Sequence, residues 1–137
     1  MTTLTVSPGD ELPGFTTTFT RATLVRYAGA SGDLNPIHWS DRAASALGLD
    51  QVIAHGMLTM GTALRVVTDW CGDPARVASY YVRFTRPVAV PDDDVGAVVT
   101  FGGRVRSVDD GVATVTLEAR CGDTSVLGQA TCEVRLD

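Results

Sequence analysis

Three runs in the second half of the chain alternate between apolar and polar residues. They are residues 97–106, 112–120 and 125–136. A two-residue period predicts β-strands that turn one face to the core and the other to water. The turn-forming stretches Asp109–Gly111 and Gly122-Asp123 separate the runs, which favours antiparallel hairpins. A further β-prone segment, 77–88, precedes them and is stopped by its prolines.

Residues 56–70 follow a different pattern. Their only charged residues are Arg65 and Asp69, which lie four positions apart, so all but one narrow stripe is apolar or small. A helix that is apolar nearly all round is normally buried nearly all round. The chain therefore predicts an α+β fold in which a curved antiparallel sheet of four or five strands wraps a long central helix.

The first fifty residues predict shorter elements. The expected segments are an irregular lead-in at 1–14, a β-prone run at 15–20, and short helices at 21–30 and 41–47. Thr20 and Ser40 are the expected N-terminal caps of the two helices, and Gly48 is the expected stop of the second. We find no repeat and no linker, so we expect one domain over 1–137.

The composition argues against nucleic-acid and membrane partners. The chain of 137 residues has a net charge of −5, and its eleven basic residues are scattered arginines. This predicts no nucleic-acid binding, which needs a cluster of cations that face phosphates. We see neither a signal peptide nor an 18-residue apolar stretch, so we expect no membrane span. Three cysteines without CxxC spacing favour a reducing compartment, and we expect a cytoplasmic protein.

The segment from Tyr27 to His38 carries the candidate chemistry. Gly32, Asn35 and Pro36 break any helix or strand there, so Asp33 and His38 lie on a bent connection that can aim both side chains at one point. A carboxylate and an imidazole that converge on a small volume can move a proton to or from a substrate or water.

These residues also carry a family resemblance. The run Tyr-Ala-Gly-Ala-Ser-Gly-Asp-Leu-Asn-Pro-Ile-His at 27–38, with Ala44 six residues on, resembles the hydratase-2 motif of the MaoC-like (R)-specific enoyl-thioester hydratases and dehydratases. The run Val-Ile-Ala-His-Gly-Met-Leu-Thr-Met-Gly at 52–61 looks like the start of that family's central helix. Both runs look most like the catalytic B subunits of actinobacterial (3R)-hydroxyacyl-carrier-protein dehydratases. The resemblance implies the hot-dog fold.

The resemblance also implies an activity and roles. It implies reversible dehydration of (3R)-hydroxyacyl thioesters, with acyl-CoA or acyl carrier protein as substrate and no cofactor. Asp33 and His38 would share the proton transfers, and which of them takes the C2 proton stays open. Gly56 would supply an oxyanion hole, because it stands where the buried helix begins and its N–H is an unpaired first-turn donor. A homodimer, or a heterodimer with a related hot-dog subunit, would cover the exposed sheet edges.

The other candidate residues have supporting roles. Asn35 is expected to order the loop, and His55 to position the helix start in preference to touching substrate. An acyl tunnel at the junction of two subunits is a candidate location for Tyr27, Trp39, Met57 and Met60. We expect no metal site, because the two histidines lie 17 residues apart without ligand spacing.

Two other functions remain open. A hot-dog acyl-thioesterase would hydrolyse the same kind of thioester, and it would release a free thiol. A non-catalytic scaffold partner of another hot-dog subunit is expected to lack the acid or the imidazole. Both groups are present here, which favours the active member.

Overall fold

The computed structural model describes residues 2–137, and its strands form one antiparallel sheet. The strand order is β1-β3-β4-β6-β2, and the short β5 pairs with β4. The strands are β1 (Glu11–Phe19), β2 (Val77–Phe84), β3 (Ala97–Asp109), β4 (Val112–Cys121), β5 (Thr124–Ser125) and β6 (Leu127–Arg135). Five long strands and one of two residues thus form the curved sheet that the alternating pattern predicts.

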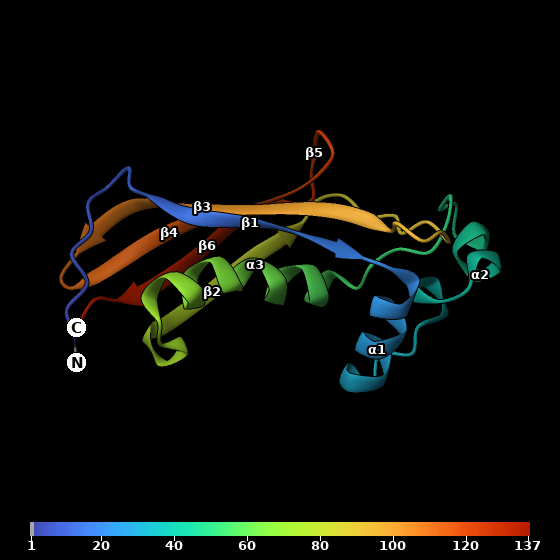
Figure 1. Ribbon diagram of the computed structural model, residues 1–137, viewed down its shortest axis with the longest axis horizontal. Coiled ribbons are helices and arrows are strands. Elements are labelled where there is room, and N and C mark those ends of the chain that lie inside the picture. Colours follow the sequence, from blue (N-terminus) through green and yellow to red (C-terminus); the bar gives the residue numbers. More distant parts are fainter. Residues whose placement is uncertain (1) are drawn as a thin grey trace.

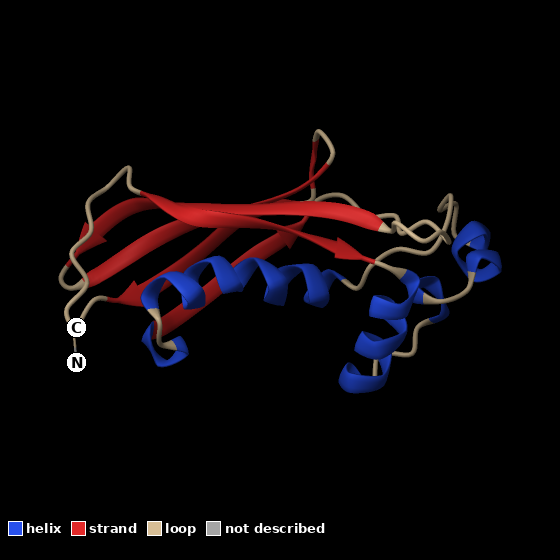
Figure 2. Cartoon of the chain, in the orientation of Figure 1, coloured by secondary structure: helices blue, strands red, loops and turns tan. Residues whose placement is uncertain are grey.

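The helices form a second layer. They are α1 (Arg21–Ser31), α2 (Asp41–Ala46) and α3 (Gly56–Cys71), with 3₁₀ turns at Pro36–His38 and Pro74–Arg76. Figure 1 shows α3 along one face of the sheet, whereas α1 and α2 lie beyond one end of it. Figure 2 shows the same separation into a strand layer and a helix layer. The expected caps are present, since the Thr20 and Ser40 side chains accept bonds from the N–H groups of Thr23 and Ala43. The predicted α+β fold is confirmed.

The first strand starts earlier than expected. Residues 2–10 form the predicted irregular lead-in, and residue 1 lies outside the described residues. The prediction is wrong from Glu11 onward, where β1 begins and carries Pro13 and Gly14 as a bulge between Leu12 and Phe15. A proline without an N–H is tolerated in this strand because β1 lies at the edge of the sheet. A methyl group at Gly14 would overlap the carbonyl oxygen of Phe101, so glycine lets β1 approach β3 here.

Other strand boundaries also differ from the prediction. Strand β2 ends at Phe84 and not near 88, and β3 continues to Asp109. The run predicted as one strand over 125–136 is interrupted at Val126, so that Thr124–Ser125 pairs only with β4 before β6 begins. Farther along β6, Gln129 adopts a positive φ of 49° at a second bulge.

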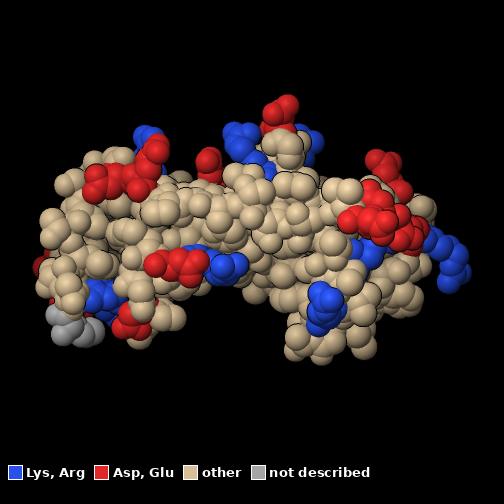
Figure 3. All heavy atoms as spheres, viewed as in Figure 1, with Lys and Arg blue, Asp and Glu red and all other residues tan. Residues whose placement is uncertain are grey.

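The central helix is exposed along one stripe only. Its sheet-facing residues Thr59, Ala63, Val66, Val67 and Cys71 are buried. Met57 is 58% exposed, and Gly61 is exposed as well. Arg65 and Asp69 are the other exposed residues of α3, so its exposed positions recur every four residues along a single stripe, and the rest of the helix is buried or half-buried as the sequence pattern predicts. Figure 3 shows charged atoms mainly along the upper edge and toward the two ends of the molecule, with broad uncharged surface between them.

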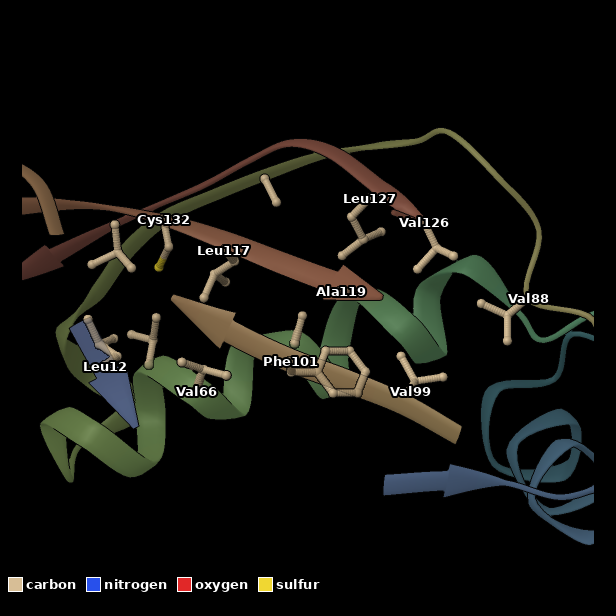
Figure 4. Close-up of a cluster of buried hydrophobic side chains, with 14 of the residues drawn as sticks. Leu12, Val66, Val88, Val99, Phe101, Leu117, Ala119, Val126, Leu127 and Cys132 are labelled. Atoms are coloured by element: carbon tan, nitrogen blue, oxygen red, sulfur yellow. The ribbon is translucent and has the colours of Figure 1, made fainter. Parts of the chain in front are cut away.

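The core lies between α3 and the sheet. Phe101 and Val99 of β3 and Leu117 and Ala119 of β4 point toward α3, which contributes Val66 (Figure 4). These strand residues are at most 3% exposed, as the alternating pattern predicts. Within the described residues, no helix is long and apolar enough to cross a bilayer.

The two ends of the chain meet at one end of the molecule. The Leu4 N–H donates to the Leu136 carbonyl oxygen at 2.9 Å. The buried guanidinium of Arg76 donates to the carbonyl oxygens of Arg135 and Thr2, at 3.2 and 2.6 Å. Figure 1 places both ends far from α1 and α2.

Candidate active site

The loop between α1 and the first 3₁₀ turn is shaped by its own side chains. Helix α1 stops at Gly32, which has a left-handed φ of 75°. The Asp33 carboxylate then accepts a bond from the N–H of Asn35, and the Asn35 side chain accepts one from the N–H of Ile37, each at 3.2 Å. Two consecutive turns of this kind bend the chain sharply. Asn35 thus makes the bond expected of a residue that orders the loop.

Asp33 and His38 face each other across this loop. Oδ2 of Asp33 lies 3.7 Å from Nε2 of His38. The His38 ring is buried, whereas the Asp33 side chain is 51% exposed. Nδ1 of His38 donates to the Ile53 carbonyl oxygen at 2.7 Å, since a carbonyl can only accept. Nε2 is therefore the nitrogen left to exchange a proton, and it points toward the carboxylate.

His55 is packed behind this pair. Its ring is 1% exposed, stacks on the His38 ring with centroids 3.8 Å apart, and meets the edge of the Tyr27 ring at 4.7 Å. Nε2 of His55 donates to the Asp33 carbonyl oxygen at 3.2 Å, and its buried Nδ1 has no partner among the described residues. Burial lowers the pKa of His55, and the nearby His38 adds to this effect. A neutral imidazole thus supports both members of the pair.

The first turn of α3 brings free N–H groups to the same place. Leu58 and Thr59 donate to the His55 carbonyl oxygen at 3.0 and 3.3 Å. Within the described residues the N–H groups of Gly56 and Met57 have no backbone acceptor. They lie at the positive end of the helix dipole, where a partial negative charge is stabilised.

A cavity of about 350 Å³ lies beside these groups. Its lining includes His38, Gly56 and Thr59, and most of the rest is apolar. Val126 and Leu127 enter it from the far end of the chain. Among the lining residues, all in the described part of the chain, Arg86 alone carries a permanent charge. The site thus combines an acid–base pair, free N–H donors and an apolar pocket.

Comparison with known proteins assigns the chain to a family. The family profile described as "MaoC like domain" matches residues 5–120. The chain belongs to this MaoC-like family. The solved structure named "MaoC-like dehydratase" superposes with a TM-score of 0.92 and 42% identity, over 96% of this chain and 41% of that one.

Two further relatives come from Mycobacterium tuberculosis. The protein named "3-hydroxyacyl-thioester dehydratase X" is 43% identical over 72 residues, which cover 53% of this chain and 25% of that protein. The ChsH1-ChsH2 complex contains a chain that matches with a TM-score of 0.85 and 27% identity, over 97% of this chain and 100% of that one. The present chain thus spans about a quarter of the dehydratase and less than half of the MaoC-like dehydratase.

The four tunnel candidates of this MaoC-like chain lie around the cavity and not on its lining. Tyr27 packs on His55, and Trp39 is exposed and donates from its ring N–H to the Leu34 carbonyl oxygen. Met57 is exposed, and the carbonyl oxygen of Met60 accepts a bond from the hydroxyl of Tyr80. Their role in a tunnel at a subunit junction stays a prediction.

Judged by distance alone, Asp33, His38 and His55 could form the ligand set of a metal ion. Candidate ligand atoms of Asp33, His38 and His55 lie within 4.8 Å of one another. The two imidazole planes are only 22° from parallel, however, and the lone pairs of a ring lie in its plane. Stacked rings cannot both direct a nitrogen at one ion, so this geometry disfavours a metal and we propose none.

Sequence reasoning missed several residues that line this cavity, and Phe84 is the one that lies against the start of α3. Phe84, at the end of β2, lines the cavity beside Gly56. It stands 28 positions after Gly56 in the chain, so no local spacing could have linked the two. Its exposure, at 55%, is high for a phenylalanine and is the structural signal that singles it out.

Proposed function

We propose that this MaoC-like domain is a hydro-lyase that interconverts (3R)-hydroxyacyl and trans-2-enoyl thioesters. The observation that carries the proposal is the Asp33 carboxylate facing the free Nε2 of His38 beside a cavity that also presents the N–H of Gly56. The names of the relatives support the same reaction class.

The chemistry requires two proton movements and one stabilised charge. In dehydration, a base removes a proton from C2, the C3–O bond breaks, and the departing hydroxyl receives a proton and leaves as water. Asp33 and His38 share these two transfers, because their side chains face each other at 3.7 Å and His38 lines the cavity. In hydration, the same pair holds the attacking water and returns a proton to C2.

The negative charge that develops on the thioester oxygen needs donors. The N–H of Gly56 is free and lies at the N-terminus of α3, so we assign it to the oxyanion hole. Glycine also leaves room for the thioester to approach the backbone closely.

The carrier and the partner follow from charge and from exposed surface. Arg86 is a permanent cation at the cavity of an acidic chain, which favours an anionic carrier such as CoA or the phosphopantetheine arm of a carrier protein. Met57 and Gly61, which are exposed at the start of α3, favour a second hot-dog subunit, either a second copy or a related chain, and one structural neighbour is itself a two-component complex. The three cysteines are free, which supports the cytoplasm as the compartment.

The test is hydration of crotonyl-CoA, followed by loss of the conjugated enoyl-thioester absorbance. We expect wild-type turnover to give the (3R) product in a coupled assay with a (3R)-specific dehydrogenase. Because proton transfer by a placed side chain contributes about 10²–10⁴ in rate, Asp33→Asn and His38→Ala should each lower kcat by about that factor.

Other outcomes separate the alternatives. Release of free thiol in place of hydration would identify an acyl-thioesterase. Failure with crotonyl-CoA, with longer acyl chains and with carrier-protein thioesters, each also with a hot-dog partner subunit added, would contradict the lyase and leave a scaffold role.

A further inference from the structure

Phe84 lies across the start of the central helix. A methyl group at Gly56 would lie 3.0 Å from two carbons of the Phe84 ring and 3.1 Å from a third. The ring therefore packs directly on the backbone of Gly56, and both residues line the cavity that holds His38. This contact joins the edge strand β2 to the N-terminal turn of α3.

The backbone around Phe84 is fixed by the neighbouring strand. Strand β6 carries one extra residue opposite β2, between the pairs Tyr81–Thr131 and Arg83–Gly128. After the bulge, the N–H of Thr85 donates to the Val126 carbonyl oxygen at 3.2 Å. A methyl group at Gly128 would lie only 2.6 Å from the side chain of Thr85, so glycine permits this close packing. The backbone that carries Phe84 is thus held in place, although its ring is half exposed.

We propose that Phe84 is a positioning residue for the thioester carbonyl, and that it imposes glycine at position 56. This inference rests on the proposed function, because it assigns the ring to the oxyanion hole. The apolar ring shields the free N–H of Gly56 from water. Donors act more strongly on a developing charge where water is excluded.

Two separate reasons then require glycine at position 56. A side chain there would block the approach of the thioester, and it would also collide with Phe84. The first reason holds whatever residue stands at 84, whereas the second disappears when the ring is removed. A double substitution can therefore tell the two apart.

The experiment compares Phe84→Ala, Phe84→Leu, Gly56→Ala and the double variant Gly56→Ala/Phe84→Ala in the crotonyl-CoA assay. Tyr81→Ala is the matched control, because Tyr81 is an aromatic residue of the same strand, is 53% exposed and does not line the cavity. Circular dichroism and sedimentation check that each variant folds and associates like the wild type.

We expect Phe84→Ala to lower kcat at least tenfold with KM within threefold, and Phe84→Leu to lower it less. Gly56→Ala should have the lowest kcat of the single variants. The kcat of the double variant should be at least tenfold higher than that of Gly56→Ala. The Tyr81→Ala variant should match the wild type. An unchanged kcat in Phe84→Ala, or a double variant no better than Gly56→Ala, would overturn the role of Phe84 while leaving the lyase intact. A wild type that is inactive on crotonyl-CoA, on longer acyl chains and on carrier-protein thioesters, with and without a partner subunit, would overturn both proposals.

Discussion

His55 is an imidazole that folding removes from water. The pKa of His55 lies below its usual value of 6.5 because burial disfavours the charged ring. The unfolded chain has no such restriction, so below about pH 6.5 it binds more protons than the folded protein does. The free energy of unfolding should therefore be fully retained above this pH and should fall as the pH drops below it.

Replacement of His55 should remove this dependence. Between pH 7.5 and 5.5, we expect the slope of the unfolding free energy against pH to be smaller in His55→Gln, by at most about 1.4 kcal/mol per pH unit. Urea denaturation followed by circular dichroism at several pH values measures both slopes. Equal slopes for the wild type and the variant would contradict the prediction, whatever the loss of stability at neutral pH.

The shape of the loop between α1 and the first 3₁₀ turn could be predicted from the sequence because its interactions are local. The turns that position Asp33, Asn35 and His38 span two or three residues each. Such turns are stabilised by hydrogen bonds from neighbouring side chains, so the local sequence is enough to predict them. Phe84 reaches the same cavity from the end of β2, and Val126 reaches it from the link between β5 and β6. Their placement depends on strand register and bulges, which no short stretch of sequence reveals.

At the scale of elements, the bulge in β6 carries local strain. Gln129 has a φ of 49°, a left-handed conformation that costs a residue with a side chain roughly 1–2 kcal/mol. We expect Gln129→Gly to raise the free energy of unfolding by about 0.5 kcal/mol, since relief of strain exceeds the greater freedom of glycine in the unfolded chain. Gln129→Val should lower it by about 1–2 kcal/mol, because β-branched residues tolerate positive φ poorly.

Chemical denaturation measures these changes. Thr116→Val is the control, because Thr116 lies exposed in the regular part of β4 and a surface change there should stay within about 0.5 kcal/mol. A Gln129→Gly variant less stable than the wild type would show that the glutamine side chain contributes more than its backbone strain costs.

Element types were predicted better than element ends. The two-residue period identified β3 and β4 and their buried residues, because alternation along a strand follows directly from its geometry. The start of β1 was missed because Pro13 and Gly14 are turn formers, and only pairing with β3 explains how a bulge can hold them in a strand. Tertiary pairing overrode local propensity there.

At the scale of the whole molecule, α3 has a side that this chain does not cover. Met57 and Gly61 lie exposed at the start of that side, and the Arg65–Asp69 ion pair continues it. A methyl group at Gly61 would meet no atom within 4 Å. We expect the chain alone to form a dimer that covers this surface. Gly61→Arg should weaken the dimer at least about tenfold, because a desolvated charge without a partner is costly.

Sedimentation velocity tests this association. Gly61→Arg should fold at least as stably as the wild type, because glycine inside a helix costs about 0.5–1 kcal/mol relative to alanine. Thr18→Arg, on the exposed face of β1, is the control and should leave the dimer intact. A wild type that sediments as a monomer would point to a different hot-dog chain as the partner, and a Gly61→Arg dimer of unchanged affinity would contradict the interface.

The junction that Arg76 makes between residues 2 and 135 has a practical consequence. Residues 2 and 135 lie side by side at the end of the molecule that lies away from α1 and α2 (Figure 1). An affinity handle at either end can therefore anchor the protein to a bead or a sensor chip without crowding the mouth of the cavity, so that small molecules in the flow reach it freely.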